Sequence, residues 1–132
     1  MKTAVIYWSG TGNTEAMANA VKEAAGSDVY FSTADSADSA KVLATDLILL
    51  GSPAMGAEQL EDSMESFFSS IEDKLGGKKV GLFGSYDWGD GQFLSDWSDR
   101  VSAAGAELVG TAKSQLAPDA DALEAVKKLL GA

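Results

Sequence analysis

The chain has 132 residues, of which ten are Lys or Arg and twenty are Asp or Glu, so its formal charge is −10 at pH 7. It contains no Cys and no His, which excludes disulfides, Cys-ligated iron–sulfur clusters, Cys/His zinc sites, His-ligated haem and His-based catalytic triads. The acidic balance argues against nucleic acid and anionic membrane as partners, and the length predicts a single domain, residues 1–132, with one continuous core.

No apolar run is long enough to span a membrane, and strand-like sequence begins too early to leave room for a signal peptide. We therefore expect a cytoplasmic protein, and a monomer.

Strand-like and helix-like segments alternate along the whole chain. The predicted strands are Thr3–Trp8, Asp28–Ser32, Asp46–Gly51, Lys78–Gly84 and Glu107–Lys113, and the predicted helices are Glu15–Ala25, Ser36–Ala44, Glu61–Leu75, Gln92–Ala104 and Asp119–Leu130. Several of the strands are apolar throughout, which indicates burial on both faces, as in a parallel sheet between helices. Five successive strand–helix units predict a three-layer, doubly wound α/β domain, in which the second helix is the weakest because its segment is rich in Ser, Ala and Asp.

The loop after the first strand, Ser9–Thr14, contains two glycines and four side chains that can form hydrogen bonds. It lies between the end of a strand and the start of a helix, where free backbone N–H groups and the positive end of the helix dipole point outward. This arrangement predicts an anion site, and phosphate is its usual ligand.

The composition of this loop indicates which class of phosphate ligand it could bind. A P-loop requires a lysine that is missing here, and the dinucleotide fingerprint requires a third glycine where this chain has Glu15. A single terminal phosphate, held by hydroxyl, amide and main-chain groups, fits the loop better. The alternative is an ordinary glycine-rich turn capped by Thr14.

Two further loops follow the third and fourth strands, at the sheet edge where doubly wound folds bind ligands. Gly51–Glu58 carries Met55, and Gly84–Gly91 carries Trp88, each on a turn flanked by glycines. A phosphate loop, a thioether and an aromatic ring at one edge suggest a planar heteroaromatic monophosphate. Flavin mononucleotide (FMN) fits this description, with its phosphate in the first loop and its ring between the other two.

These three loops resemble those of the short-chain flavodoxins, the type found in fermentative anaerobes. The resemblance lies in Tyr7–Glu15, Pro53–Gly56 and Gly84–Gly89, which occur in the family's order and at its separations, and it extends from about residue 3 to the C-terminus. It implies a flavodoxin-like five-stranded parallel sheet in the order 2-1-3-4-5, with helices on both faces. The fifth strand lacks the insertion that marks long-chain flavodoxins.

The resemblance also assigns roles to residues. The side chains of Ser9, Thr11, Asn13 and Thr14 would hold the FMN phosphate. Met55 would pack on the inner face of the isoalloxazine ring and Trp88 on the outer face, Glu58 would bond the N3 edge, and Ser85 with the 84–90 backbone would line the ribityl and pyrimidine side. The complete implied cofactor-binding set is Ser9, Gly10, Thr11, Gly12, Asn13, Thr14, Ser52, Pro53, Ala54, Met55, Gly56, Ala57, Glu58, Ser85, Tyr86, Asp87, Trp88, Gly89 and Asp90, with no metal ligand and no catalytic acid or base.

In the family, the peptide corresponding to Gly56–Ala57 turns over on one-electron reduction, so that its carbonyl accepts a hydrogen bond from flavin N5. Glycine at position 56 suits a turn that reaches positive φ. Two residues depart from the family pattern: Asp87 stands where glycine is common, and Ser52 stands where relatives often have cysteine.

The function implied is that of a low-potential one-electron carrier, and not of an enzyme. FMN would shuttle between semiquinone and hydroquinone, and an acidic, lysine-free pocket would keep the second potential low. The partners would be reductases and ferredoxin-using oxidoreductases with basic docking patches. They would meet an acidic face around the flavin edge that is formed by Glu58, Glu61, Asp62, Glu65, Asp87 and Asp90.

Two alternatives stay open at this point. The first is a minimal FMN-dependent quinone or nitro reductase on the same fold. The second is a non-flavin phosphate-binding or receiver-like domain, which is disfavoured because receivers need acidic residues where this chain has Ser9–Thr11.

Overall fold

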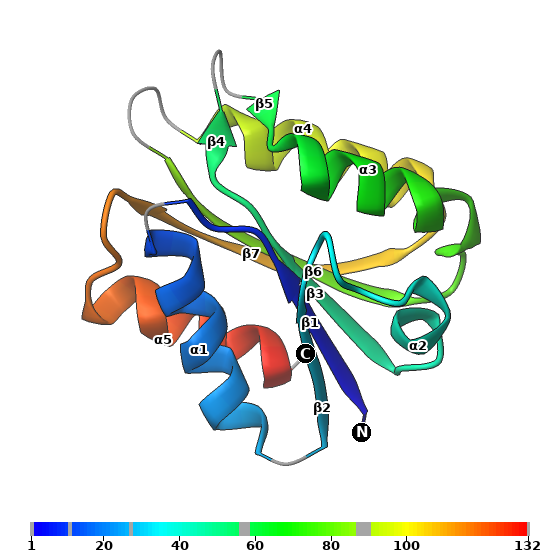
Figure 1. Ribbon diagram of the computed structural model, residues 1–132, viewed down its shortest axis with the longest axis horizontal. Helices are drawn as coiled ribbons and strands as arrows, with labels where there is room; N and C mark the ends of the chain where they lie inside the picture. The colour runs from blue at the N-terminus through cyan, green and yellow to red at the C-terminus, as the bar shows by residue number, and fades with distance from the viewer. Residues whose placement is uncertain (1, 11, 27, 56–58, 87–90, 132) are drawn as a thin grey trace.

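A five-stranded parallel sheet forms the centre of the molecule, with strands in the order β2-β1-β3-β6-β7 (Figure 1). This computed structural model describes residues 2–10, 12–26, 28–55, 59–86 and 91–131. Numbered as the five strands of this sheet alone, the order is 2-1-3-4-5, so the predicted fold class is confirmed. Within the described ranges, no helix combines the length and the apolar character that crossing a bilayer requires.

The elements follow the predicted alternation. The sheet contains β1 (Thr3–Tyr7), β2 (Val29–Thr33), β3 (Leu47–Gly51), β6 (Lys79–Tyr86) and β7 (Glu107–Gln115); the helices are α1 (Asn13–Ala25), α2 (Ser39–Leu43), α3 (Asp62–Ile71), α4 (Gln92–Ala103) and α5 (Ala120–Lys128), with 3₁₀ turns η1 (Glu72–Lys74) and η2 (Leu129–Gly131). The last two strands extend two residues beyond their predicted ends because their pairing continues to Tyr86 and Gln115.

Two local features differ from the predictions. Helix α2 is only five residues long, because Asp38 caps its N-terminus by accepting a hydrogen bond from the N–H of Ala40. An antiparallel pair, β4 (Ala54–Met55) and β5 (Gln59–Leu60), lies in the loop after β3, where no strand was predicted. Two residues on each side are too short for a period-2 pattern to be visible in the sequence.

The core is divided by the sheet into two layers. Helices α2, α3 and α4 cover one face, where Ile6 and Leu50 pack, and α1 and α5 cover the other, where Val5 and Leu49 pack (Figure 1). Successive side chains of a strand point to opposite faces, so a strand between two helical layers is buried at every position. All residues of β1 and β3 are buried, which explains their unbroken apolar sequence.

Glycines at the ends of β3 and β6 allow a close approach that places the functional loops. A Cβ at Gly51 would overlap the ring of Phe83, and a Cβ at Gly84 would overlap the carbonyl oxygen of Ser52. Both contacts would be shorter than those that real Cβ atoms make, so a larger residue at either glycine would push the two strand ends apart. The loops after β3 and β6 therefore start side by side.

An ion-pair network joins α3 to α4 on the outside of the sheet. The guanidinium of Arg100 donates to both carboxylate oxygens of Glu65, at 2.7 and 2.9 Å, and to those of Glu72, at 3.1 and 3.2 Å. It also lies 4.8 Å from the centroid of the Phe68 ring. Hydrogen bonds from Arg100 hold the pKa of Glu65 below its ordinary value of 4.5, and the two carboxylates raise the pKa of Arg100.

Replacing Arg100 by Gln should lower the free energy of unfolding at pH 7 by about 1 kcal/mol, because the bidentate pairs are partly exposed and screened. The folded-state pKa of Glu65 is lowered, so its contribution is present above the pKa of the unfolded chain and is lost as the pH falls through the folded-state value. Urea denaturation of both proteins from pH 7 downward measures this difference, which should shrink as Glu65 becomes protonated. Lys127→Gln, which removes a single exposed ion pair at 3.4 Å, is the control.

Candidate functional site

A pocket of about 300 Å³ opens at the carboxyl ends of β1, β3 and β6. It is lined by Trp8, Gly10, Asn13, Pro53, Ala54, Met55, Ser85, Tyr86 and Leu116. All of these except Trp8 and Leu116 belong to the set predicted from the sequence. The three loops that the sequence singled out therefore meet at one edge of the sheet.

The N-terminus of α1 is uncapped on the pocket side. Gly12 holds the N-cap position with φ 97°, and no side chain in the described part of the chain caps the first turn of the helix. The N–H of Gly12 donates to Oγ of Ser9 at 3.0 Å, which closes the loop on itself. The first-turn N–H groups cannot find partners inside their own helix, so together with the helix dipole they offer an anion site.

Thr14 is not the cap of this helix, so the interpretation of the loop as a turn capped by Thr14 is wrong. Thr14 is instead the second residue of α1, and its hydroxyl lies 2.9 Å from the hydroxyl of Ser85. Both side chains are buried. This contact joins the start of α1 directly to the end of β6. The position of the predicted phosphate site therefore depends on the position of the residues predicted to line the ribityl side.

The other end of the pocket has an apolar wall. Met55 is 42% exposed and Leu116 is 53% exposed, and both line this pocket. Leu116 also has a positive φ of 59°, and its N–H donates to the carbonyl of Tyr86 at 2.8 Å. Large apolar side chains left open to solvent, one of them on a strained backbone, are typical of a surface that a ligand covers.

Trp8 contributes an aromatic wall that was not included in the predicted set. Its N–H donates to the carbonyl of Gly51 at 3.1 Å, and its indole lies so close to Gly10 that a Cβ there would be 3.0 Å from ring atom Cη2. The absence of a side chain at Gly10 therefore makes room for the indole ring beside the loop after β1. The position of Trp8 at the end of a buried strand was a usable signal, whereas Leu116 follows a polar stretch and gave none.

Tyr7, at the end of β1, is hydrogen-bonded to the first turn of α1. Its hydroxyl donates to the carboxylate of Glu15 at 3.3 Å. Burial raises the pKa of Tyr7, and the charge of Glu15 and the hydrogen bond to it raise that pKa further. The phenol therefore stays protonated and keeps donating across the physiological pH range.

The structure places other predicted residues away from the pocket wall. Ser52 is buried, donates to the carbonyl of Pro53 at 2.9 Å and accepts from the N–H of Glu61 at 3.3 Å, so it shapes the turn after β3. Ser9 and Gly12 shape the first loop, as described above. The remaining predictions lie outside the described residues, namely Thr11, Gly56, Ala57, Glu58, Asp87, Trp88, Gly89 and Asp90.

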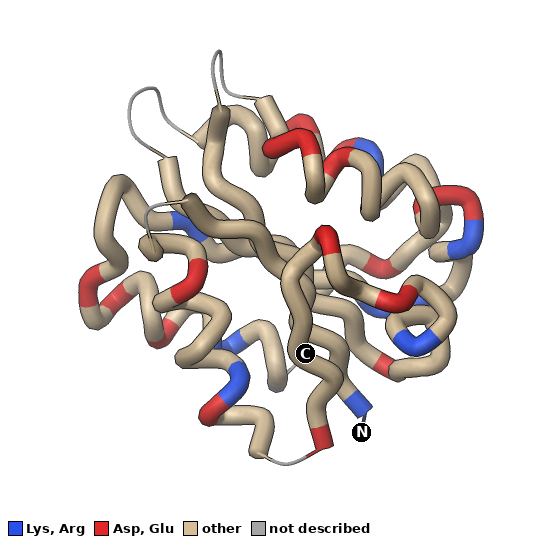
Figure 2. Tube along the Cα trace, in the orientation of Figure 1, with Lys and Arg blue, Asp and Glu red and all other residues tan. Residues whose placement is uncertain are grey.

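The structure corrects one prediction about charge. Glu61 is only 6% exposed, and its carboxylate caps α3 by accepting from the N–H of Met64 at 3.0 Å, so it is not part of an exposed acidic face. No lysine is among the described residues that line the pocket, and the ammonium of Lys113 lies 5.8 Å from the centroid of the Tyr86 ring. Of the predicted acidic residues that the structure describes, Asp62 is exposed, and Glu65 is partly buried and paired with Arg100. Figure 2 shows acidic positions at the start of α3.

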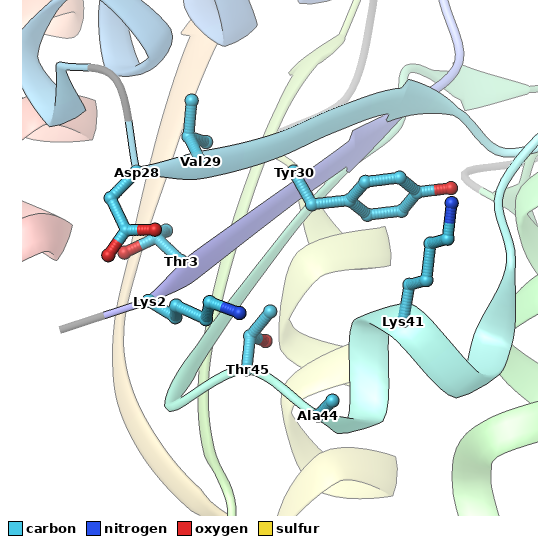
Figure 3. Close-up of a pocket in the computed structure, with 8 residues that line it drawn as sticks. All are labelled: Lys2, Thr3, Asp28, Val29, Tyr30, Lys41, Ala44 and Thr45. Carbon is cyan, nitrogen blue, oxygen red and sulfur yellow. The ribbon is translucent and has the colours of Figure 1, made fainter.

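A larger pocket, of about 390 Å³, lies at the opposite end of β1 and β2 (Figure 3). It is lined by Lys2, Thr3, Asp28, Val29, Tyr30, Lys41, Ala44 and Thr45. This is the amino-terminal edge of a parallel sheet, whereas doubly wound folds bind their ligands at the carboxyl edge. We therefore assign the functional site to the smaller pocket, where the uncapped helix and the exposed apolar side chains meet.

Comparison with known proteins agrees with this assignment. A family model described as Flavodoxin matches residues 5–128. The chain is 50% identical over 119 residues to a flavodoxin of Megasphaera elsdenii, with 87% of each chain covered. It is 42% identical over 111 residues to a flavodoxin of Clostridium beijerinckii, with 81% of this chain and 80% of that protein covered.

Solved structures give the same result. The solution structure of two-electron reduced Megasphaera elsdenii flavodoxin superposes with a TM-score of 0.88 at 46% identity, covering 98% of this chain and 99% of that one. The crystal structure of oxidised Flavodoxin 2 from Bacillus cereus superposes with a TM-score of 0.82 at 33% identity, covering 97% and 94%.

The contact between Thr14 and Ser85 generates a prediction about affinity. Ser85→Ala should weaken FMN binding roughly fivefold, the equivalent of about 1 kcal/mol for one lost hydrogen bond, because it leaves Thr14, beside the predicted phosphate site, without its buried partner. Riboflavin, which has no phosphate, should lose much less. Quenching of flavin fluorescence by the apoprotein measures both affinities, and Ser70→Ala on α3 is the control.

An equal loss for both flavins would contradict this reasoning. It would show that Ser85 acts on the ring side alone, as the resemblance by itself implies.

Proposed function

The chain belongs to the flavodoxin family of FMN-binding electron carriers, and from that premise we propose that it shuttles bound FMN between semiquinone and hydroquinone at low potential. The observation that carries this proposal is the composition of the pocket, which places an uncapped helix N-terminus at one end and the exposed side chains of Met55 and Leu116 at the other. A flavin monophosphate has the same two ends, one anionic and one flat and apolar.

The residues of the pocket fit this cofactor. Ser9, Asn13 and the N–H groups of the first turn of α1 would hold the phosphate without a formal positive charge. Met55 would pack on the inner face of the ring, where the bound cofactor would remove its side chain from water. Trp88 would cover the outer face, and Glu58 would bond the N3 edge.

Bound FMN would supply the redox chemistry, and the protein would set how far apart the potentials of its two one-electron steps lie. The peptide between Gly56 and Ala57 would turn over as the first electron arrives, so that a carbonyl accepts a hydrogen bond from the ring. A second electron would add negative charge inside a protein whose formal charge is already −10, and this would keep the second potential low.

Docking would use the acidic surface near the flavin edge. Asp62 is exposed at the start of α3, and Glu65 lies one turn further along the helix, partly neutralised by Arg100. Basic patches on reductases and on ferredoxin-using oxidoreductases complement such a surface, and electrostatic steering favours fast, transient encounters with a small interface. We further propose that the carrier is a cytoplasmic monomer.

A redox titration followed by visible spectra tests this function. The purified protein should contain FMN and take up two electrons in two separate steps, with an intermediate that has the spectrum of a neutral flavin radical. Mixing with NADPH alone should leave the flavin oxidised over seconds in a stopped-flow instrument. Rapid bleaching by NADPH would instead support the alternative of a quinone or nitro reductase.

A second test addresses the peptide at residues 56 and 57. Gly56→Ala should lower the stability of the one-electron reduced state by about 1–3 kcal/mol, because a side chain would oppose the positive φ that the turnover is expected to require. The two potentials would move toward each other, and less radical would accumulate at the midpoint. The control is Gly76→Ala, since Gly76 has an ordinary φ and open space where the methyl group of an alanine would lie. An unchanged radical yield in Gly56→Ala would be evidence against the turnover.

A further inference from the structure

We propose that Leu116 is a cofactor-binding residue whose side chain covers part of the apolar surface of the flavin, and that its strained backbone is retained because it directs this side chain into the pocket. The inference rests on the proposed function, since it takes FMN as the ligand, and it deepens that function. It concerns a residue that follows β7, outside the three loops that the sequence singled out.

Leu116 is the first residue after β7, at the edge of the sheet that carries the site (Figure 1). The parallel pairing of β6 with β7 ends at Tyr86 and Gln115, so Leu116 leaves the sheet beside the end of β6. Its side chain lines the same pocket as Trp8 and Met55, which follow β1 and β3. A fourth segment of the chain therefore contributes to the wall of the site.

Packing of the protein core does not account for the side chain of Leu116. It is 53% exposed, and within the described ranges it belongs to neither of the two core layers. In the part of the chain that the structure describes, Leu116 and Met55 are the two large apolar residues that are exposed, and both line this pocket. Two such side chains at one pocket indicate a ligand with apolar surface.

The backbone of Leu116 is in the left-handed region, with φ 59°, and no other non-glycine residue among those described has a positive φ. This conformation is unfavourable for a residue with a Cβ, and Leu lacks the polar side chain with which Asn or Asp tolerates it. The N–H of Leu116 donates to the carbonyl of Tyr86 at 2.8 Å, and its carbonyl accepts from the hydroxyl of buried Ser114 at 3.3 Å. Both backbone polar groups are thus held inside the protein, so the fold fixes the strained conformation.

Neither feature of Leu116 favours folding. The left-handed backbone opposes it, and the exposed side chain buries too little surface within the protein to offset that strain. Strain of this kind persists at ligand sites, where it is part of the function. Because Leu offers only apolar surface, its contact would be with the carbon skeleton of the flavin and not with the phosphate. A bound flavin would remove the side chain of Leu116 from water and gain affinity from it.

The experiment compares Leu116→Ala with Leu116→Gly, after removal of FMN, for binding of FMN and of riboflavin. Both variants lose the Leu side chain, so both should bind each flavin about fivefold more weakly, as expected when the apolar surface of one Leu is lost. The loss should be the same for the two flavins, in contrast to that of Ser85→Ala, because the contact does not involve the phosphate. Quenching of flavin fluorescence measures all four affinities.

The two variants should differ in stability, because Leu116→Gly alone removes the Cβ that opposes a positive φ. In urea denaturation of the FMN-free proteins, the equilibrium constant for unfolding should be about threefold lower in Leu116→Gly than in Leu116→Ala. This order is the reverse of the usual one, in which glycine destabilises a protein relative to alanine.

Ala117→Gly is the matched control. Ala117 is the next residue along the chain, is exposed, has no positive φ and does not line the pocket. Glycine should raise the unfolding constant at this position, because it adds freedom to the unfolded chain without relieving strain. The affinities for both flavins should stay as they are in the unmodified protein.

Leu116→Asn keeps the test decisive if Leu116→Ala does not fold, because Asn tolerates the left-handed region better than Ala. It should bind both flavins as weakly as Leu116→Gly does. If none of the three variants folds, Leu116 is a residue of the fold alone and the inference is overturned.

The remaining outcomes separate this inference from the proposed function. The inference is overturned if removal of the Leu116 side chain leaves both flavin affinities unchanged, if it weakens binding of FMN but not of riboflavin, or if Leu116→Gly is less stable than Leu116→Ala. In each of these cases the function stands, provided that the unmodified protein binds FMN and takes up electrons in two separate steps. If the unmodified protein does not bind FMN, the proposed function fails, and the inference fails with it.

Discussion

The burial of the central strands on both faces is the constraint on which the rest of the molecule depends. Every residue of β1 and β3 is buried, so these strands have no surface left with which to bind a ligand. Polar and ligand-facing groups are forced to the sheet edge, where the strands end and the helices begin. Since the strands are parallel, the loops after β1, β3 and β6 leave the sheet at the same edge, and the close approach at Gly51 and Gly84 brings two of them together.

An anion site without a lysine follows from this arrangement. The N-terminus of α1 points its backbone N–H groups toward the pocket, and Gly12 with its left-handed φ gives the chain the turn it needs without adding a side chain that would cap them. A lysine beside the phosphate would add affinity, but it would also raise the potential of a nearby reduced flavin. In the proposed site, dipoles would hold the phosphate with less effect on the flavin ring, because the field of a dipole falls off faster with distance than that of a full charge.

Much of the fold was predictable because its causes are local in the sequence. Unbroken apolar runs identified the buried strands, and glycines after strands identified the loops. The site was less predictable because its remaining parts depend on contacts across the chain. Leu116 follows a polar stretch, and nothing in its neighbourhood indicates a positive φ or its contact with Tyr86. Glu61 reads as a surface carboxylate, and only the start of α3 shows that it is a buried helix cap.

Lys113 shows why the charge of a site cannot be judged from its loops alone. The three loops contain no lysine, and the composition of the whole chain is strongly acidic, so the sequence suggested a site with only negative surroundings. The pairing of β6 with β7 brings in a cation from a strand far along the chain. Net charge sets the average field at long range, whereas a charge close to a site acts over a few ångströms. The charge around the pocket therefore depends on which strands pair as well as on the composition of its loops.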